Sequence, residues 1–163
     1  DEAGNLEPYN GVTNQTTTFI EPCDEPDAWE EDNTFTTSQV FTGTQTHNFC
    51  DAGDEDWVQL FLEANATYFI TTTPLDPSAA VVVELYGEDG TTLLSQVFPQ
   101  DPNGLPTSGT DTFGLPTLLI FRPTTSGTYF LRLTHPVSSV AGSAVQYELA
   151  VNSYQVFMPV IVR

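Results

Sequence analysis

The apolar residues of this chain occur in short runs that alternate with polar residues and are separated by turn residues. Runs rich in Val, Phe, Tyr and Thr, bounded by Gly, Pro, Asn and Asp, are typical of β-strands. They predict strands at residues 57–62, 67–72, 79–86, 92–98, 118–122, 128–133 and 145–151. No run has the period and length of a useful helix. This spacing predicts an all-β domain, an antiparallel β-sandwich of jelly-roll type, with a barrel as the second option.

Three of these runs carry further information. The runs at 57–62 and 67–72 are separated by only a short polar loop, which predicts a hairpin. The run at 79–86 contains three consecutive valines, which indicates a strand buried on both faces. Alternation over 128–133 places Phe130 and Arg132 on one face of their strand.

Both ends of the chain differ from this regular pattern. Residues 1–27 form a polar N-terminal extension with one short possible strand at 16–20, residues 28–151 form the sandwich, and residues 152–163 form an apolar C-terminal strand. The last strand is apolar on both faces, and Pro159 restricts it to a sheet edge or a bulge. It either closes its own sandwich or adds to a neighbouring subunit. Residues 99–116, with four Pro and three Gly, predict a long loop.

Composition supports strands and narrows the possible partners. The chain has 24 Thr and no Lys, and its formal net charge is −19. Such a negative field repels nucleic acid and anionic membranes, and no segment has a membrane-spanning pattern. Fifteen of the 22 acidic residues lie within residues 1–63, which fits a cation site, a solvated acidic face or adaptation to high salt.

The first residue and the cysteines both bear on the cellular compartment. The chain starts at Asp1 without Met, which fits a mature exported protein, with a truncation boundary as the alternative. Cys23 and Cys50 are the only cysteines, so their connectivity is fixed if they pair. Two buried free thiols are the alternative, but the polar sequence around Cys23 favours a disulfide. We therefore expect an extracellular or cell-surface protein.

Several short motifs occur in an order found in one known family. They are Asp27–Asn33, His47-Asn48-Phe49, Gly53-Asp54-Glu55-Asp56-Trp57-Val58, 64–68, 84–90, 126–132 and Tyr147-Glu148-Leu149. In this order they resemble bacterial pre-peptidase C-terminal domains over about residues 28–151. The segment Gly53–Trp57 is the most specific of them.

The resemblance implies an antiparallel β-sandwich of secreted proteins, often appended to peptidases and binding calcium in some members. This chain departs from the family at Glu30–Asn33, where the family has Glu-Pro followed by Asn or Asp and then Asp. The acidic pair that often follows the family's Leu-Tyr turn is replaced here by the long Pro- and Gly-rich loop.

Four acidic residues match the family's acidic positions and are the candidate calcium ligands: Glu30, Asp32, Asp54 and Asp56. Calcium takes 6–8 oxygen ligands from several segments, so Asn33 and Asp51 could add to them. A cation would also relieve the repulsion among clustered carboxylates. The alternative is that Asp54 and Asp56 only cap a turn before Trp57. We expect a structural role for the ion.

Catalytic interpretations find little support in the sequence. His47 and His135 are the only histidines, and their spacing does not make a zinc motif. His47 is expected to pack or to hydrogen-bond rather than to act as a base. A nucleophile elbow and a phosphate-binding loop are also missing from the sequence. We therefore expect a non-enzyme.

Two functions remain. The first is a secreted structural subunit that polymerises with itself into an extracellular filament or surface layer, by strand exchange resembling donor-strand complementation. The residues expected to carry this assembly lie in the two terminal segments: Thr16, Thr18, Ile20, Val156, Met158, Val160 and Val162. The second is a calcium-stabilised module that binds polysaccharide or protein fibres and accompanies secreted enzymes. Trp29, Tyr86 and Tyr129 are the candidate aromatic contacts for such a ligand.

Overall fold

The computed structural model describes residues 23–99 and 114–154, and all regular structure in these residues is β-strand. The strands are β1 (Gln39–Val40), β2 (Gln45–Asn48), β3 (Glu55–Leu62), β4 (Thr67–Pro74), β5 (Val82–Tyr86), β6 (Leu93–Val97), β7 (Thr117–Phe121), β8 (Gly127–Thr134) and β9 (Gln146–Tyr154). None of the described residues belongs to a helix that could cross a membrane.

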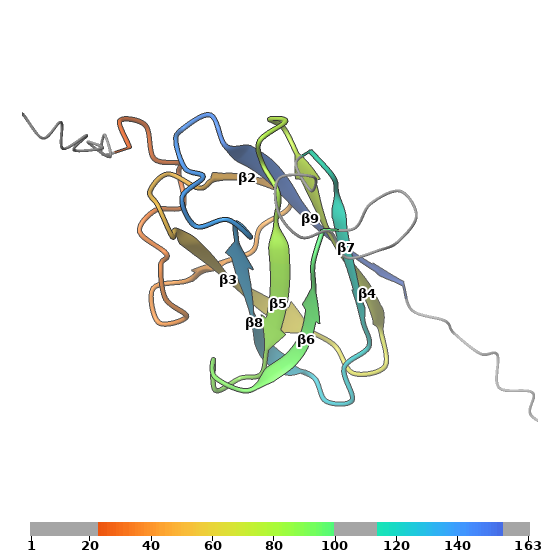
Figure 1. Ribbon diagram of the computed structural model, residues 1–163. Coiled ribbons are helices and arrows are strands. Elements are labelled where there is room, and N and C mark those ends of the chain that lie inside the picture. The colour runs from red at the N-terminus through yellow and green to blue at the C-terminus, as the bar shows by residue number, and fades with distance from the viewer. Residues whose placement is uncertain (1–22, 100–113, 155–163) are drawn as a thin grey trace, which may run out of the picture.

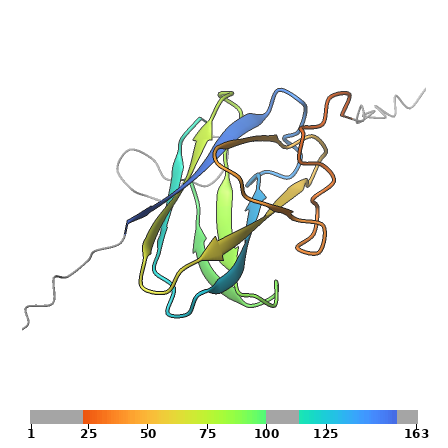
Figure 2. The same cartoon turned by 180° about the vertical axis from the view of Figure 1, so that it is seen from behind.

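The strands form two sheets that pack face to face (Figure 1), which confirms the predicted all-β sandwich. One sheet has the order β1-β3-β8-β5-β6 and the other the order β2-β9-β4-β7. Seen from behind, β9, an inner strand of the second sheet, runs diagonally through the view (Figure 2). Every pairing is antiparallel except the short contact of β1 with β3, which is parallel.

The core lies between the two sheets and follows the alternation of the sequence. On β8, Leu131 and Leu133 are fully buried in the core. Phe130 and Arg132 share the opposite face, as predicted, where the Phe130 ring contacts Phe35 and the Arg132 guanidinium lies over Trp57. The three valines before and within β5 are at most 5% exposed, which confirms burial on both faces.

The predicted hairpin between 57–62 and 67–72 is wrong. β3 pairs with β1 and β8, whereas β4 pairs with β7 and β9 in the other sheet. The connecting backbone bonds to the β7–β8 connection: Asn65 N donates to Pro123 O at 2.9 Å, and Ala64 N donates to Ser126 Oγ at 2.8 Å. A hairpin and a crossing between sheets give the same apolar alternation, because both direct one face of each strand into the core.

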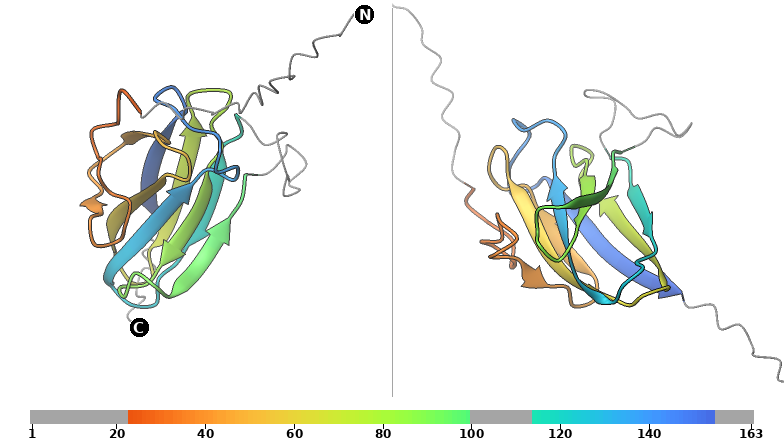
Figure 3. Two further views of the ribbon diagram at one scale, coloured as in Figure 1. Left: turned by 60° about the vertical axis from the view of Figure 1, so that its left-hand side comes forward. Right: turned by 90° about the horizontal axis from the view of Figure 1, so that it is seen from below.

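Residues 23–38 form a strap that contains no strand and lies against one end of the sandwich (Figure 3). The disulfide between Cys23 and Cys50 attaches its beginning, which confirms the predicted pairing. Phe35 packs over Gly90 so closely that a Cβ atom there would lie 2.4 Å from the ring. The strap therefore belongs to the folded domain, and at the other end β9 continues to Tyr154.

Candidate metal centre

Five carboxylates from three parts of the chain converge beside the disulfide, and we call them the acidic cluster. Its members are Asp27, Glu30, Asp32, Asp54 and Asp56. The strap supplies the first three, the β2–β3 turn supplies Asp54, and β3 supplies Asp56. An open pocket of about 320 Å³ is lined by Glu30 and Asp54, with Asn33 and Asp51 beside them. This pocket connects the acidic cluster with solvent.

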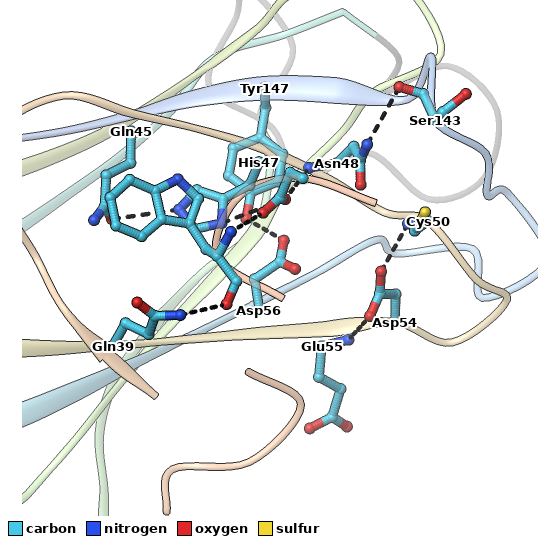
Figure 4. Close-up of polar contacts among 12 residues, drawn as sticks. Gln39, Gln45, His47, Asn48, Cys50, Asp54, Glu55, Asp56, Ser143 and Tyr147 are labelled. Carbon is cyan, nitrogen blue, oxygen red and sulfur yellow. Dashed lines mark hydrogen bonds and ion pairs between the residues drawn. The ribbon is translucent and has the colours of Figure 1, made fainter. Parts of the chain in front are cut away.

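Asp32 and Asp56 are the buried members of the acidic cluster. Asp32 is 1% exposed and Asp56 is fully buried. One oxygen of Asp56, Oδ2, accepts a hydrogen bond from the Tyr147 hydroxyl (Figure 4). The Oδ1 atoms of both aspartates are buried and have no hydrogen-bond partner among the described residues. Buried polar atoms are nearly always paired, so each of these two carboxyl groups is expected either to carry a proton or to contact a cation.

Electrostatics disfavour the ionised form of the acidic cluster in the folded protein. Burial, with added repulsion from Asp54 and Asp27, raises the pKa of Glu30 to about 7. Burial and then repulsion from Glu30 and Asp27 raise the pKa of Asp32 to about 8. Burial also raises the pKa of Asp56 well above its ordinary value, although the Tyr147 hydrogen bond opposes this shift. Without a counter-ion, the ionised acidic cluster is therefore costly in the folded state.

Asp54 has a second role that the sequence also allowed. Its Oδ2 accepts a hydrogen bond from Cys50 N at 2.7 Å, and its Oδ1 accepts one from Glu55 N at 3.0 Å. Asp54 therefore caps the turn that leads into β3. Because it also raises the pKa of Glu30 and Asp32 through repulsion, it lies close enough to contribute to the field at the pocket.

Asp27 is a member of the acidic cluster that the sequence analysis missed. Its Oδ1 accepts from Trp29 N and its Oδ2 from Asn48 N, both at 2.8 Å. Asn48 Nδ2 also donates to Glu25 O at 3.0 Å, so the strap is bonded to β2. The available signal was the position of Asp27 four residues after Cys23, since the disulfide brings this part of the strap close to the β2–β3 turn.

The two histidines are both buried. His47 lies between the rings of Trp29 and Tyr147, with centroid distances of 6.0 and 5.6 Å. Burial lowers the pKa of His47 to about 4, so its ring is neutral at pH 7. His135 is 8% exposed, and its two ring nitrogens contact Val137 O at 2.8 Å and Ser78 O at 3.1 Å.

The structure brings the four predicted calcium ligands into one region, and three of them have carboxylate oxygens close to one another. One carboxylate oxygen each from Glu30, Asp32 and Asp56 lies within 4.8 Å of the others. All donors of this set are oxygens, the atoms that calcium binds, and Asp32 and Asp56 each have a buried oxygen without a partner among the described residues. The ligand assignment itself stays a prediction, and Asn33 and Asp51 lie on the pocket wall as possible additional oxygen donors.

The other predicted contact residues have mixed outcomes. Tyr129 as an exposed aromatic contact is wrong, because it is 7% exposed, packs in the core and donates its hydroxyl hydrogen to Thr125 O. Trp29 and Tyr86 are half-buried. All seven predicted assembly residues, Thr16, Thr18, Ile20, Val156, Met158, Val160 and Val162, lie outside the described residues.

Comparisons with known proteins find likeness in structure only. No protein-family model and no curated protein sequence matches the chain. The chain is similar to the pre-peptidase C-terminal domain of a Bacillus anthracis collagenase, at 14% identity over 71% of this chain and 93% of that one, with a TM-score of 0.48. It is also similar to CorA of Methylomicrobium album BG8, a surface-associated copper-binding protein, at 10% identity over 70% of this chain and 96% of that one, with a TM-score of 0.53.

A third similar structure is PliG of Aeromonas hydrophila, a periplasmic inhibitor of g-type lysozyme. The identity is 13% over 72% of this chain and 96% of that one, with a TM-score of 0.44. The chain is thus similar in structure to a pre-peptidase C-terminal domain, as its motifs predict. At these identities the likeness concerns the fold.

Proposed function

We propose that the chain is a non-catalytic, calcium-stabilised structural module that works outside the cytoplasm. The observation that carries this proposal is the convergence of Glu30, Asp32 and Asp56, with two buried and unpartnered oxygens, beside an open pocket. Calcium bound there neutralises the acidic cluster and joins the strap to β3, so its binding energy adds to the stability of the fold.

The proposed location follows from the disulfide and from the similar structures. Disulfides persist in oxidising compartments outside the cytoplasm, and Cys23 and Cys50 form one. Two of the similar structures are described as surface-associated or periplasmic. The charge of −19 agrees with a partner that is neither nucleic acid nor an anionic membrane.

A calcium titration of chelator-treated protein, followed by thermal unfolding, tests the metal proposal. We expect Tm to rise with calcium and Asp32→Asn to lose most of this rise, because the substitution removes a buried ligand. Glu88→Gln is the matched control, since it removes one negative charge at an exposed position in the β5–β6 turn. A Tm that does not respond to calcium in the unmodified protein would refute the proposed site.

A second candidate function, assembly with copies of itself, is favoured by the open edge of the second sheet. Among the described strands β7 pairs only with β4, and its other edge, which β6 approaches without pairing, is the edge that would accept a strand. On its outer face Leu118 is 48% exposed and Ile120 is 56% exposed. Ile120 lies opposite Phe69, whose ring contacts the exposed Tyr154. The side chains of an added apolar strand would lie beside Leu118 and Ile120 on this face.

We infer that residues 155–163 of a second copy occupy this edge, because their sequence is apolar and they directly follow β9. Negative-stain microscopy and sedimentation test the inference, with and without a chelator. We expect polymers that disappear in the Leu118→Lys/Ile120→Lys variant and after deletion of 155–163. Leu93→Lys on β6, which replaces a side chain of 47% exposure in the other sheet, is the control. Polymers that persist in both altered proteins would exclude this edge.

The alternative of a module that binds polysaccharide or protein fibres keeps Trp29 and Tyr86 as candidate contacts. Tyr86 lies on the outer face of the first sheet, where its ring is 5.2 Å from that of Trp57 and Arg132 lies over both rings. Saturable binding of the monomeric protein to such a polymer, lost in Tyr86→Ala, would favour this function over assembly.

A further inference from the structure

We propose that Asp27, His47 and Asp56 form a second metal site, which takes a divalent ion of the zinc class. The strap, β2 and β3 each supply one residue, and one ligand atom from each lies within 4.8 Å of the other two. This set contains a nitrogen donor, whereas the proposed calcium set contains only oxygens. The two sets share Asp56 and are otherwise separate.

The arrangement around His47 Nδ1 is the first argument for this site. The side chain is 1% exposed, and Nδ1 has no hydrogen-bond partner among the described residues. Asp27 Oδ2 lies 3.7 Å from Nδ1, which is too long for a hydrogen bond. Two ligands of one tetrahedral zinc ion, each at about 2.0–2.2 Å, lie about 3.3–3.6 Å apart. The observed separation is therefore close to that of two atoms on one ion.

The other ring nitrogen sets the tautomer that such a site needs. His47 Nε2 faces Gln45 Oε1 at 3.4 Å, and a carbonyl oxygen can only accept. In the tautomer that donates from Nε2 to Gln45 Oε1, Nδ1 carries a lone pair and lies within 4.8 Å of a carboxylate oxygen of Asp27 and of Asp56. A lone pair beside two carboxylates is repulsive unless a proton or a metal ion lies between them. An ion bound there would also pair the orphaned Oδ1 of Asp56.

All three side chains are held in place by groups outside the proposed site. Trp29 and Tyr147 enclose the His47 ring on its two sides, and Figure 4 shows His47, Tyr147 and Asp56 together. Backbone N–H groups hold both oxygens of Asp27, and the Tyr147 hydroxyl holds Oδ2 of Asp56. Such outer partners orient metal ligands and raise affinity.

The donor set selects the class of ion. Calcium binds oxygen atoms, whereas an imidazole nitrogen with carboxylates suits zinc and its neighbours among the transition metals. The competing explanation is that His47 only fills space between two aromatic rings. In that case added zinc would leave the nitrogen resonances of its ring unchanged.

The test is a zinc titration of the chelator-treated protein, followed by long-range proton–nitrogen NMR of the two imidazoles. We expect one zinc ion to bind and to shift Nδ1 of His47, while His135 provides the internal control. Zinc that binds without shifting the His47 nitrogen, or that does not bind, would overturn the proposal. This measurement needs no variant, so it shows whether zinc binds through His47 even if substitutions impair folding.

Substitution separates the two metal sites. We expect His47→Gln to weaken zinc binding by more than about 100-fold, because the loss of an outer partner of a ligand alone costs about 10–100-fold, and to leave calcium affinity unchanged. Glu88→Gln should change neither affinity. Unchanged zinc affinity in His47→Gln would overturn the second site. If calcium does not raise the Tm of the unmodified protein, only the proposed calcium site is refuted.

Discussion

In the presence of a chelator, Tm is expected to fall by about 6–12 °C as the pH rises from about 4 to about 8. Ionised Asp32 and Glu30 are disfavoured in the folded protein, where their pKa values are about 8 and about 7. In the unfolded chain both groups ionise near pH 4. After a discount for solvent screening, we expect a loss on the order of 3 kcal/mol. Each kcal/mol corresponds to roughly 2–4 °C in a domain of this size.

The direction of this effect follows from proton linkage. Between these two pH values the folded state holds protons that the unfolded state has released, so folding takes up protons and stability falls as pH rises. Asp27 and Asp54 add to the repulsion, and the neutral His47 ring does not offset it. Bound calcium favours the ionised carboxylates and should therefore abolish or reverse the slope.

Thermal unfolding at fixed salt across this pH range provides the measurement. Asp32→Asn should be more stable than the unmodified protein at pH 8 with chelator, because it removes the buried charge, and it should also lose the response to calcium. Glu88→Gln should retain the full pH dependence. A chelated protein whose Tm is the same at pH 5 and pH 8 would show that the acidic cluster is not costly when ionised.

Reduction of the disulfide should lower the free energy of unfolding by about 3–4 kcal/mol. Cys23 and Cys50 are separated by 27 residues, and a loop of this length gives that value on the chain-entropy estimate. The closed loop contains Asp27, Glu30, Asp32 and His47, so reduction also releases the strap that supplies metal ligands. We therefore expect weaker calcium binding by the reduced protein.

Urea unfolding with and without reductant measures the first effect, and calcium titration of each form measures the second. The Cys23→Ser/Cys50→Ser variant should behave like the reduced protein and should not respond to reductant. If reduction leaves the urea midpoint unchanged, the hydrogen bonds of Asp27 and Asn48 hold the strap without the covalent link.

The sequence was informative about strands and less so about their partners. Alternation located β8 and the valine run of β5, because side-chain direction within a strand depends only on local residues. It wrongly paired β3 with β4, because a hairpin and a crossing between sheets bury the same residues. What decided between them was the bonding of Asn65 and Ala64 to the β7–β8 connection, which involves residues about 60 positions away.

The acidic cluster shows the same division between local and long-range information. Glu30, Asp32, Asp54 and Asp56 were found because short motifs carry them. Asp27 begins the first of these motifs but was left in the N-terminal extension, since nothing local shows that it bonds to Asn48. Tyr147 was noticed only as part of a closing strand, although its hydroxyl bonds to Asp56, which is 91 residues away.

The position of β9 determines how the module would respond to mechanical load. β9 lies between β2 and β4, and its pairing with β4 extends from Tyr147 opposite Pro74 to Tyr154 opposite Thr67. Hydrogen bonds of an antiparallel ladder are perpendicular to the strands, so a pull along β9 from Tyr154 strains them together in shear. At the other end of the described chain, a pull on Cys23 is transmitted through a covalent bond to Cys50. A pull at Tyr154 is therefore resisted by all hydrogen bonds of the β4–β9 ladder together, and a pull at Cys23 is resisted by the disulfide.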